Sequence, residues 1–156
     1  MLRYVITLFV TGLSIALSAQ VFPVGTRTIT WTDPARSNRS VGVLFYYPAV
    51  SAGSNTSVAN GTFPFVILGH GFQINASSYP AYSDTLAKLG YIVALPTTEG
   101  SLSPSHSNYA QDFIFIYDKL IQESASNAAS PFYQKVVSKG AIGGHSMGGG
   151  ATVLSA

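Results

Sequence analysis

The sequence predicts an α/β fold in which a mostly parallel sheet is flanked by helices. From Phe63 onward, strand-like apolar runs alternate with helix-like segments, and this order is typical of parallel strands covered by helices. Hydrophobic residues make up 47% of the chain and charged residues 9%, which supplies a core and excludes disorder for most of the chain. The length of 156 residues corresponds to one domain or less.

Two strands are predicted before this alternation begins. Residues Thr26–Thr32 alternate polar with apolar side chains, as a half-buried strand does. Residues Val41–Tyr47 form a second β-rich run that Pro48 stops. Residues 49–62 are small and polar, so we expect a solvated connection that ends in a tight turn at Asn60-Gly61.

The next three elements follow in the order strand, helix, strand. The continuous apolar run Phe65–Leu68 predicts a strand buried on both faces. A helix is expected over Pro80–Leu89, with Ser77 or Ser78 as its N-cap. Residues Tyr91–Leu95 predict another buried strand.

The last elements lead to a glycine-rich segment. Residues Asn108–Glu123 carry apolar side chains at helical spacing and predict an amphipathic helix. The end of Val136–Ile142 predicts a strand, and a helix is expected to begin after Ser146.

Residues 1–19 read as a signal peptide. Arg3 precedes the uncharged, mostly apolar run Tyr4–Leu17. A membrane anchor is the alternative, but the polar Gln20 comes before the roughly 20 apolar residues that a spanning helix needs. We therefore expect cleavage after Ser18 or Ala19, a mature domain over residues 20–156 without a stable membrane anchor, and a secreted or periplasmic location.

Charge and residue counts exclude several kinds of function. Eight basic and six acidic residues give a net charge of +2, which offers no electrostatic support for binding nucleic acid. The absence of cysteine excludes disulfides, thiolate metal sites and thiol nucleophiles. Three histidines and six acids without clustered spacing give no metal signature, so we expect no metal and no cofactor.

One motif points to chemistry. The segment Gly144-His145-Ser146-Met147-Gly148 is G-x-S-x-G, in which a serine projects from a sharp turn between a strand and a helix. The glycines allow neighbouring segments to approach that turn, and the helix N-terminus favours developing negative charge. A glycine-rich turn without chemistry is the alternative interpretation.

A second segment belongs to the same end of the predicted sheet. Gly69-His70-Gly71-Phe72 follows the first buried strand directly, and the carboxyl ends of parallel strands share one rim. We therefore expect this loop to face Ser146. His70 is either an ordinary loop histidine bonded to backbone or a substrate contact, and Phe72 is either a substrate-facing aromatic residue or a core side chain.

These two motifs together resemble the α/β-hydrolase superfamily. The resemblance is to its secreted esterases: cutinases, polyester hydrolases, and the dienelactone-hydrolase and platelet-activating-factor-acetylhydrolase-like groups. The segments Asp33–Arg36 and Val43–Pro48 are similar to the entry strands of these groups, so the resemblance covers residues 26–156.

The resemblance implies a serine hydrolase that cleaves small or polymeric carboxylic esters through an acyl-enzyme. It makes Ser146 the nucleophile, and the backbone N–H groups of Met147 and Phe72 the oxyanion-hole donors. It also places Phe72, Met147 and His70 beside the substrate.

The resemblance also implies an acid and a base that come after the serine in the chain. Ten residues follow Ser146 here, without Asp, Glu or His. We therefore expect the N-terminal part of a hydrolase domain, truncated after the elbow and inactive by itself. Recruitment of His106 or His70 as the base, and a peptidase or lipase chemistry, stay open. A non-catalytic secreted binding module that retains an unused elbow is the alternative from another functional class.

Overall fold

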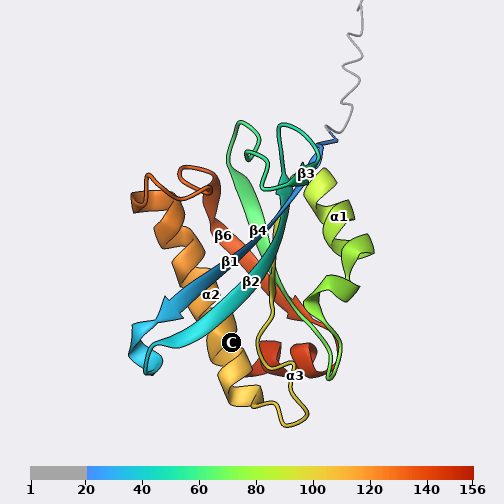
Figure 1. Cartoon of the computed structure of the whole chain (residues 1–156), viewed down its shortest axis with the longest axis vertical. Helices are drawn as coiled ribbons and strands as arrows, with labels where there is room; N and C mark the ends of the chain where they lie inside the picture. The colour runs from blue at the N-terminus through green and yellow to red at the C-terminus, as the bar shows by residue number, and fades with distance from the viewer. Residues whose placement is uncertain (1–20) are drawn as a thin grey trace, which may run out of the picture.

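The computed structural model describes residues 21–156, so the predicted leader over residues 1–19 lies outside the described residues. Within residues 21–156 the chain forms one six-stranded sheet and three α-helices (Figure 1). No helix in this range has the length and apolar character of a membrane span. The strands are β1 (Val24–Asp33), β2 (Arg39–Pro48), β3 (Gly53–Ser54), β4 (Phe63–Gly69), β5 (Ile92–Pro96) and β6 (Val136–Gly144). The helices are α1 (Pro80–Lys88), α2 (His106–Ser126) and α3 (Met147–Leu154), with 3-10 turns at Pro34–Arg36 and Ala76–Ser78.

The sheet is mixed, with the strand order β3-β1-β2-β5-β4-β6. Strands β4, β5 and β6 are parallel, as the alternation from Phe63 onward predicts. In contrast, β1 pairs with β2, and β2 with β5, in antiparallel fashion. The expectation of a mostly parallel sheet is therefore right for the second half of the chain. For β1 and β2 the sequence predicts strands without a direction, and the two are antiparallel because a short link can join neighbouring strands only as a hairpin.

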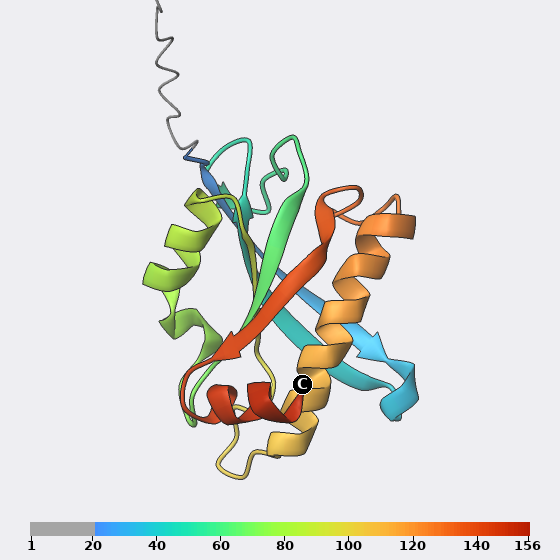
Figure 2. The ribbon, with the colours of Figure 1, turned by 180° about the vertical axis from the view of Figure 1, so that it is seen from behind.

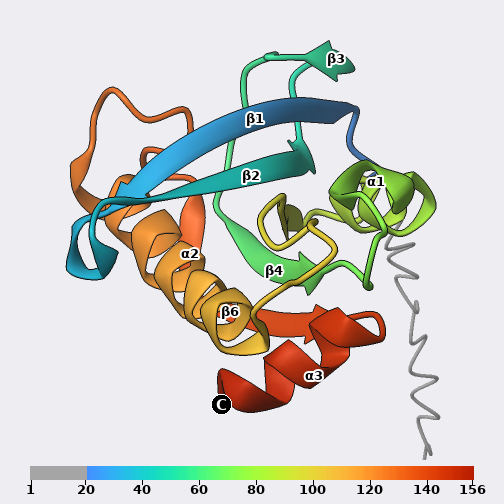
Figure 3. The same cartoon turned by 60° about the horizontal axis from the view of Figure 1, so that its bottom comes forward.

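The two faces of the sheet are covered by different helices (Figure 3). Alternate side chains of a strand point to opposite faces, and this alternation divides the core of the protein. Val43 and Phe45 of β2 pack in the cluster that contains α2 and α3. Leu44 of β2 packs in the smaller cluster beside α1. Figure 2 shows the first face, with β6 beside β4 and with α2 next to α3.

Three sequence expectations need correction. Residues 49–62 are not wholly solvated, since Val58 and Ala59 are buried, and they include the short exposed strand β3. Strand β4 alternates fully and partly buried residues, because α1 covers its second face incompletely. Neither Ser77 nor Ser78 caps α1. Both lie in a 3-10 turn, and the N-cap is Tyr79, without a side-chain cap.

The chain changes direction within the sheet at β4. After β4 it passes through α1 to β5 on one side of β4, and it then returns through α2 to β6 on the other side. Helix α1, which follows β4, and helix α3, which follows β6, lie on opposite faces of the sheet, so the loops at the carboxyl ends of these neighbouring strands run to opposite sides. Ligands of open α/β sheets bind at such a switch point.

A buried charged network fixes the other loops at this end of the sheet. The Asp112 carboxylate on α2 is fully buried, and it accepts two hydrogen bonds of 2.8 Å from Arg39. Arg36 Nη2 lies 2.7 Å from Asp112 Oδ1, and the Thr98 hydroxyl donates to Oδ2 at 2.6 Å. The bonds to Asp112, together with one to Glu99, raise the pKa of Arg39 well above its ordinary value, although burial opposes the shift. One carboxylate thus joins α2, the β1–β2 turn and the loop after β5.

Substitution Asp112→Ala is expected to lower the free energy of unfolding by about 3 kcal/mol, because it leaves two partly buried guanidinium groups without their shared partner. Asp118→Ala, at an exposed position of the same helix, should change it by less than about 0.5 kcal/mol. Urea unfolding followed by circular dichroism measures both. Equal unfolding midpoints for the two variants would contradict a structural role for the network.

Candidate active site

Ser146 occupies the turn between β6 and α3 in a strained backbone conformation. Strand β6 ends at Gly144 and α3 begins at Met147, and the serine between them has φ 52° and ψ −113°. Ser37, in the β1–β2 turn, shares the φ of 52°, but its ψ of 41° places it in the ordinary left-handed region. Holding a non-glycine residue outside the common regions costs about 1–3 kcal/mol, and such residues cluster at functional sites.

Two glycines make this turn possible by close approach. A Cβ atom at Gly148 would overlap the Gly69 carbonyl and would lie 2.9 Å from the Gly69 Cα. A Cβ atom at Gly144 would lie 2.8 Å from the Gly149 nitrogen. The motif glycines therefore allow the first turn of α3 to pack directly on the backbone of β4 and β6.

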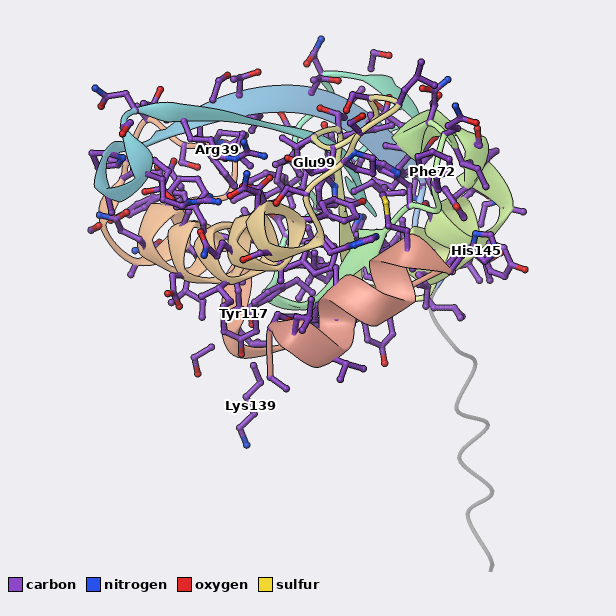
Figure 4. The ribbon with its side chains drawn as sticks, turned by 90° about the horizontal axis from the view of Figure 1, so that it is seen from below. Arg39, Phe72, Glu99, Tyr117, Lys139 and His145 are labelled. Carbon is purple, nitrogen blue, oxygen red and sulfur yellow. The ribbon has the colours of Figure 1, made fainter. Side chains whose placement is uncertain are left out.

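The loop after β4 and the elbow lie side by side, as the sequence predicts. In the parallel pairing of β4 with β6, Gly69 is the register partner of Gly144. The His145 N–H continues this pairing beyond the strand, since it donates to the Gly69 carbonyl at 3.0 Å. In Figure 4, Phe72 and His145 lie near the N-terminal end of α3.

The backbone N–H groups of Ser146, Met147 and Phe72 have no protein acceptor within residues 21–156. The family resemblance assigns two of them, those of Met147 and Phe72, to the oxyanion hole, and that role stays a prediction. The Met147 side chain is 8% exposed and belongs to the core, whereas Phe72 is 47% exposed. Of the two interpretations of Phe72, the core side chain is therefore wrong.

His70 is buried, and both of its ring nitrogens lie on backbone carbonyl oxygens. Its Nδ1 lies 2.9 Å from the Gly71 carbonyl oxygen, and its Nε2 lies 2.8 Å from that of Thr98. Its backbone N–H donates to the Tyr109 hydroxyl at 2.8 Å. This placement favours the structural interpretation, in which the ring holds the loop after β4 against the loop after β5. Direct contact of His70 with substrate stays a prediction.

Sequence reasoning missed two tyrosines that hold the loop. Tyr109, on α2, supplies the hydroxyl that accepts from His70, and burial raises its pKa well above the ordinary value, although the bond from His70 opposes the shift. Tyr79 accepts from the Gly71 N–H at 2.9 Å. No sequence motif marks either tyrosine as part of the site. An aromatic residue at helical spacing is most often part of a core, so its position alone does not indicate this role.

Neither of the other two histidines contacts Ser146 through a hydrogen bond within the described residues. His106 is the exposed first residue of α2. His145 is exposed, and its Nδ1 lies 3.0 Å from the Tyr79 hydroxyl. His70 has both ring nitrogens on carbonyl oxygens. The structure therefore does not pair Ser146 with a base among residues 21–156.

An apolar groove of about 560 Å³ borders the elbow on the side of α1. Its walls come from the loop after β4, from α1 and from the end of β6. The lining residues are Leu68, Ile74, Ser78, Tyr79, Tyr82, Leu86, Gly144 and His145. Residues 21–156 contain no group of three or more His, Asp or Glu side chains arranged to hold a metal ion.

Comparison with known proteins supports the fold of this chain. No protein-family model matches it, and no curated protein matches it. Among solved structures, the chain is similar to a ferulic acid esterase from Streptomyces cinnamoneus, with a TM-score of 0.70 and 20% sequence identity. The match covers 93% of this chain and 58% of the esterase chain, so this chain spans little more than half the length of that protein. The two proteins share a mixed α/β fold.

The close packing of the elbow predicts opposite effects for two neighbouring glycines. Gly148→Ala is expected to lower the free energy of unfolding by about 1–3 kcal/mol, because the new methyl group overlaps the backbone at Gly69. Gly150→Ala is the matched control: a Cβ atom there meets nothing within 4 Å, so alanine should stabilise α3 by up to about 1 kcal/mol. Thermal or urea unfolding distinguishes the two. Stabilisation by both alanines would show that β4 and α3 are not in contact at Gly148.

Proposed function

We propose that this chain carries the nucleophile half of a serine hydrolase of the α/β-hydrolase superfamily, and that it acts on carboxylic esters. The observation that carries the proposal is the backbone of Ser146, held at φ 52° and ψ −113° between a parallel strand and a helix N-terminus. A strained serine in a strand-to-helix turn is what the nucleophile elbow of that superfamily requires, and this supports the proposal. The fold shared with a ferulic acid esterase supports the same conclusion.

The proposed reaction is acyl transfer in two steps. The Ser146 oxygen attacks the carbonyl carbon of the ester, and its proton passes to a base. The carbonyl oxygen becomes an oxyanion that accepts from the Met147 and Phe72 N–H groups, neither of which has an acceptor among residues 21–156. The C–O bond to the alcohol then breaks, and the alcohol leaves with the proton. Water subsequently attacks the acyl-enzyme, releases the carboxylic acid and restores the serine.

The base is the missing part of this arrangement. A serine is a weak nucleophile until a base lies within hydrogen-bond reach. The contacts of His70, His106 and His145 give none of them that position. We therefore propose that the base and its acid come from outside this sequence, in a longer protein whose leader over residues 1–19 directs it to export.

The test of the nucleophile is covalent labelling of the complete gene product. A fluorophosphonate probe should label the parent protein, which should also hydrolyse a short-chain p-nitrophenyl ester. Ser146→Ala should abolish labelling and lower kcat by at least about 1,000-fold. Ser138→Ala, at an exposed position on β6, should retain both within about twofold. Unchanged hydrolysis by the Ser146→Ala variant would end the proposal.

A non-catalytic binding module is the second candidate, because within residues 21–156 no histidine is bonded to Ser146. Reading the gene beyond the codon for Ala156 separates the two candidates. A continuing frame that encodes an Asp and then a His supports the hydrolase. A frame that supplies neither, in a protein that the fluorophosphonate does not label, supports the binding module.

A further inference from the structure

We infer that Tyr79 is a positioning residue that clamps the loop after β4 to the nucleophile elbow. Its hydroxyl oxygen accepts from the Gly71 N–H at 2.9 Å and lies 3.0 Å from His145 Nδ1. Gly71 directly precedes Phe72, and His145 directly precedes Ser146. The Tyr79 hydroxyl thus bonds to the residue before Phe72, the proposed oxyanion-hole donor, and to the residue before Ser146, the proposed nucleophile.

The hydrogen-bond donors and acceptors of Gly71, Tyr79 and His145 match one another. A phenolic hydroxyl has one donor and can accept as well. Because the Gly71 N–H can only donate, Tyr79 accepts there and has its own proton available for His145. In the neutral imidazole, His145 Nδ1 then accepts and Nε2 carries the hydrogen. All three polar groups are satisfied at once.

Packing gives the clamp little freedom. Gly71 is buried, and a Cβ atom there would lie 2.9 Å from His145 Nδ1 and 3.1 Å from Ile74 Cδ1. The Tyr79 ring packs against the cluster on the α1 face of the sheet. The bond from the His145 N–H to the Gly69 carbonyl is the second tie between loop and elbow, at 3.0 Å. The bonds of His70 to Tyr109 and Thr98 hold the loop against α2 and the loop after β5, and the two ties between loop and elbow fix its position relative to the elbow.

The function of this clamp rests on the proposed reaction. The Phe72 N–H belongs to a loop and the Met147 N–H to a helix, so their separation is set by contacts between two different elements. Displacements of about 1 Å in such a site cost up to 100-fold in rate. Loss of one of two ties should therefore lower kcat by about tenfold and leave KM within about twofold, because ground-state binding does not use the oxyanion hole.

The experiment compares Tyr79→Phe with Tyr82→Phe in the complete gene product. Tyr82 lines the same groove and is 68% exposed, so its substitution controls for loss of a nearby phenol. The first readout is hydrogen–deuterium exchange at the Gly71 amide, which should accelerate about five- to tenfold in Tyr79→Phe and not in Tyr82→Phe. The second readout is kcat and KM for a p-nitrophenyl ester.

The two readouts separate the clamp from the proposed function. Faster Gly71 exchange with a tenfold lower kcat supports both. If Gly71 exchanges faster in Tyr79→Phe but the parent protein neither hydrolyses esters nor reacts with a fluorophosphonate, the clamp is kept and the proposed function is overturned. Unchanged exchange and unchanged kcat in Tyr79→Phe overturn the clamp, and an equal fall of kcat in both variants overturns it as well.

Discussion

The contact between the backbone at Gly69 and the first turn of α3 is the constraint on which the rest of the site depends. The parallel strands β4 and β6 end in register at Gly69 and Gly144. Helix α3 begins at Met147, and its first turn packs against the ends of both strands. This packing leaves no room for a Cβ atom at Gly148. The serine between strand and helix must therefore turn sharply, and its strained φ and ψ are the consequence. The packing energy of the surrounding sheet and helices offsets this local strain.

Ionic and aromatic contacts support this junction from two sides. The buried Asp112 carboxylate fixes the loop after β5 by accepting a hydrogen bond from the Thr98 hydroxyl. The Thr98 carbonyl oxygen in turn lies 2.8 Å from His70 Nε2. On the other side, Tyr79 joins the loop after β4 to the elbow. These contacts start from different elements and converge on the segment 69–72. Their common effect is to hold backbone N–H groups in place, which is the kind of preorganisation that stabilises a developing oxyanion.

The structure holds Ser146 in a strained turn beside N–H groups that have no protein acceptor, and within residues 21–156 no histidine is hydrogen-bonded to this serine. Each histidine has another position: His70 is bonded to carbonyl groups, His145 to Tyr79, and His106 lies at the exposed start of α2. This division is consistent with the proposed function, in which an acid and a base follow the serine.

The sequence by itself determined the α/β class, the order of elements and the position of the elbow, because hydrophobic periodicity and glycine spacing are local properties of the chain. It did not show the antiparallel β1–β2 pair in a mixed sheet, the burial of Val58 and Ala59, or the exposure of Phe72. It also gave no sign of Tyr79. Only the tertiary structure decided these features. Strand neighbours, burial and hydrogen-bond partners depend on residues far apart in the sequence, which meet only when the sheet is assembled.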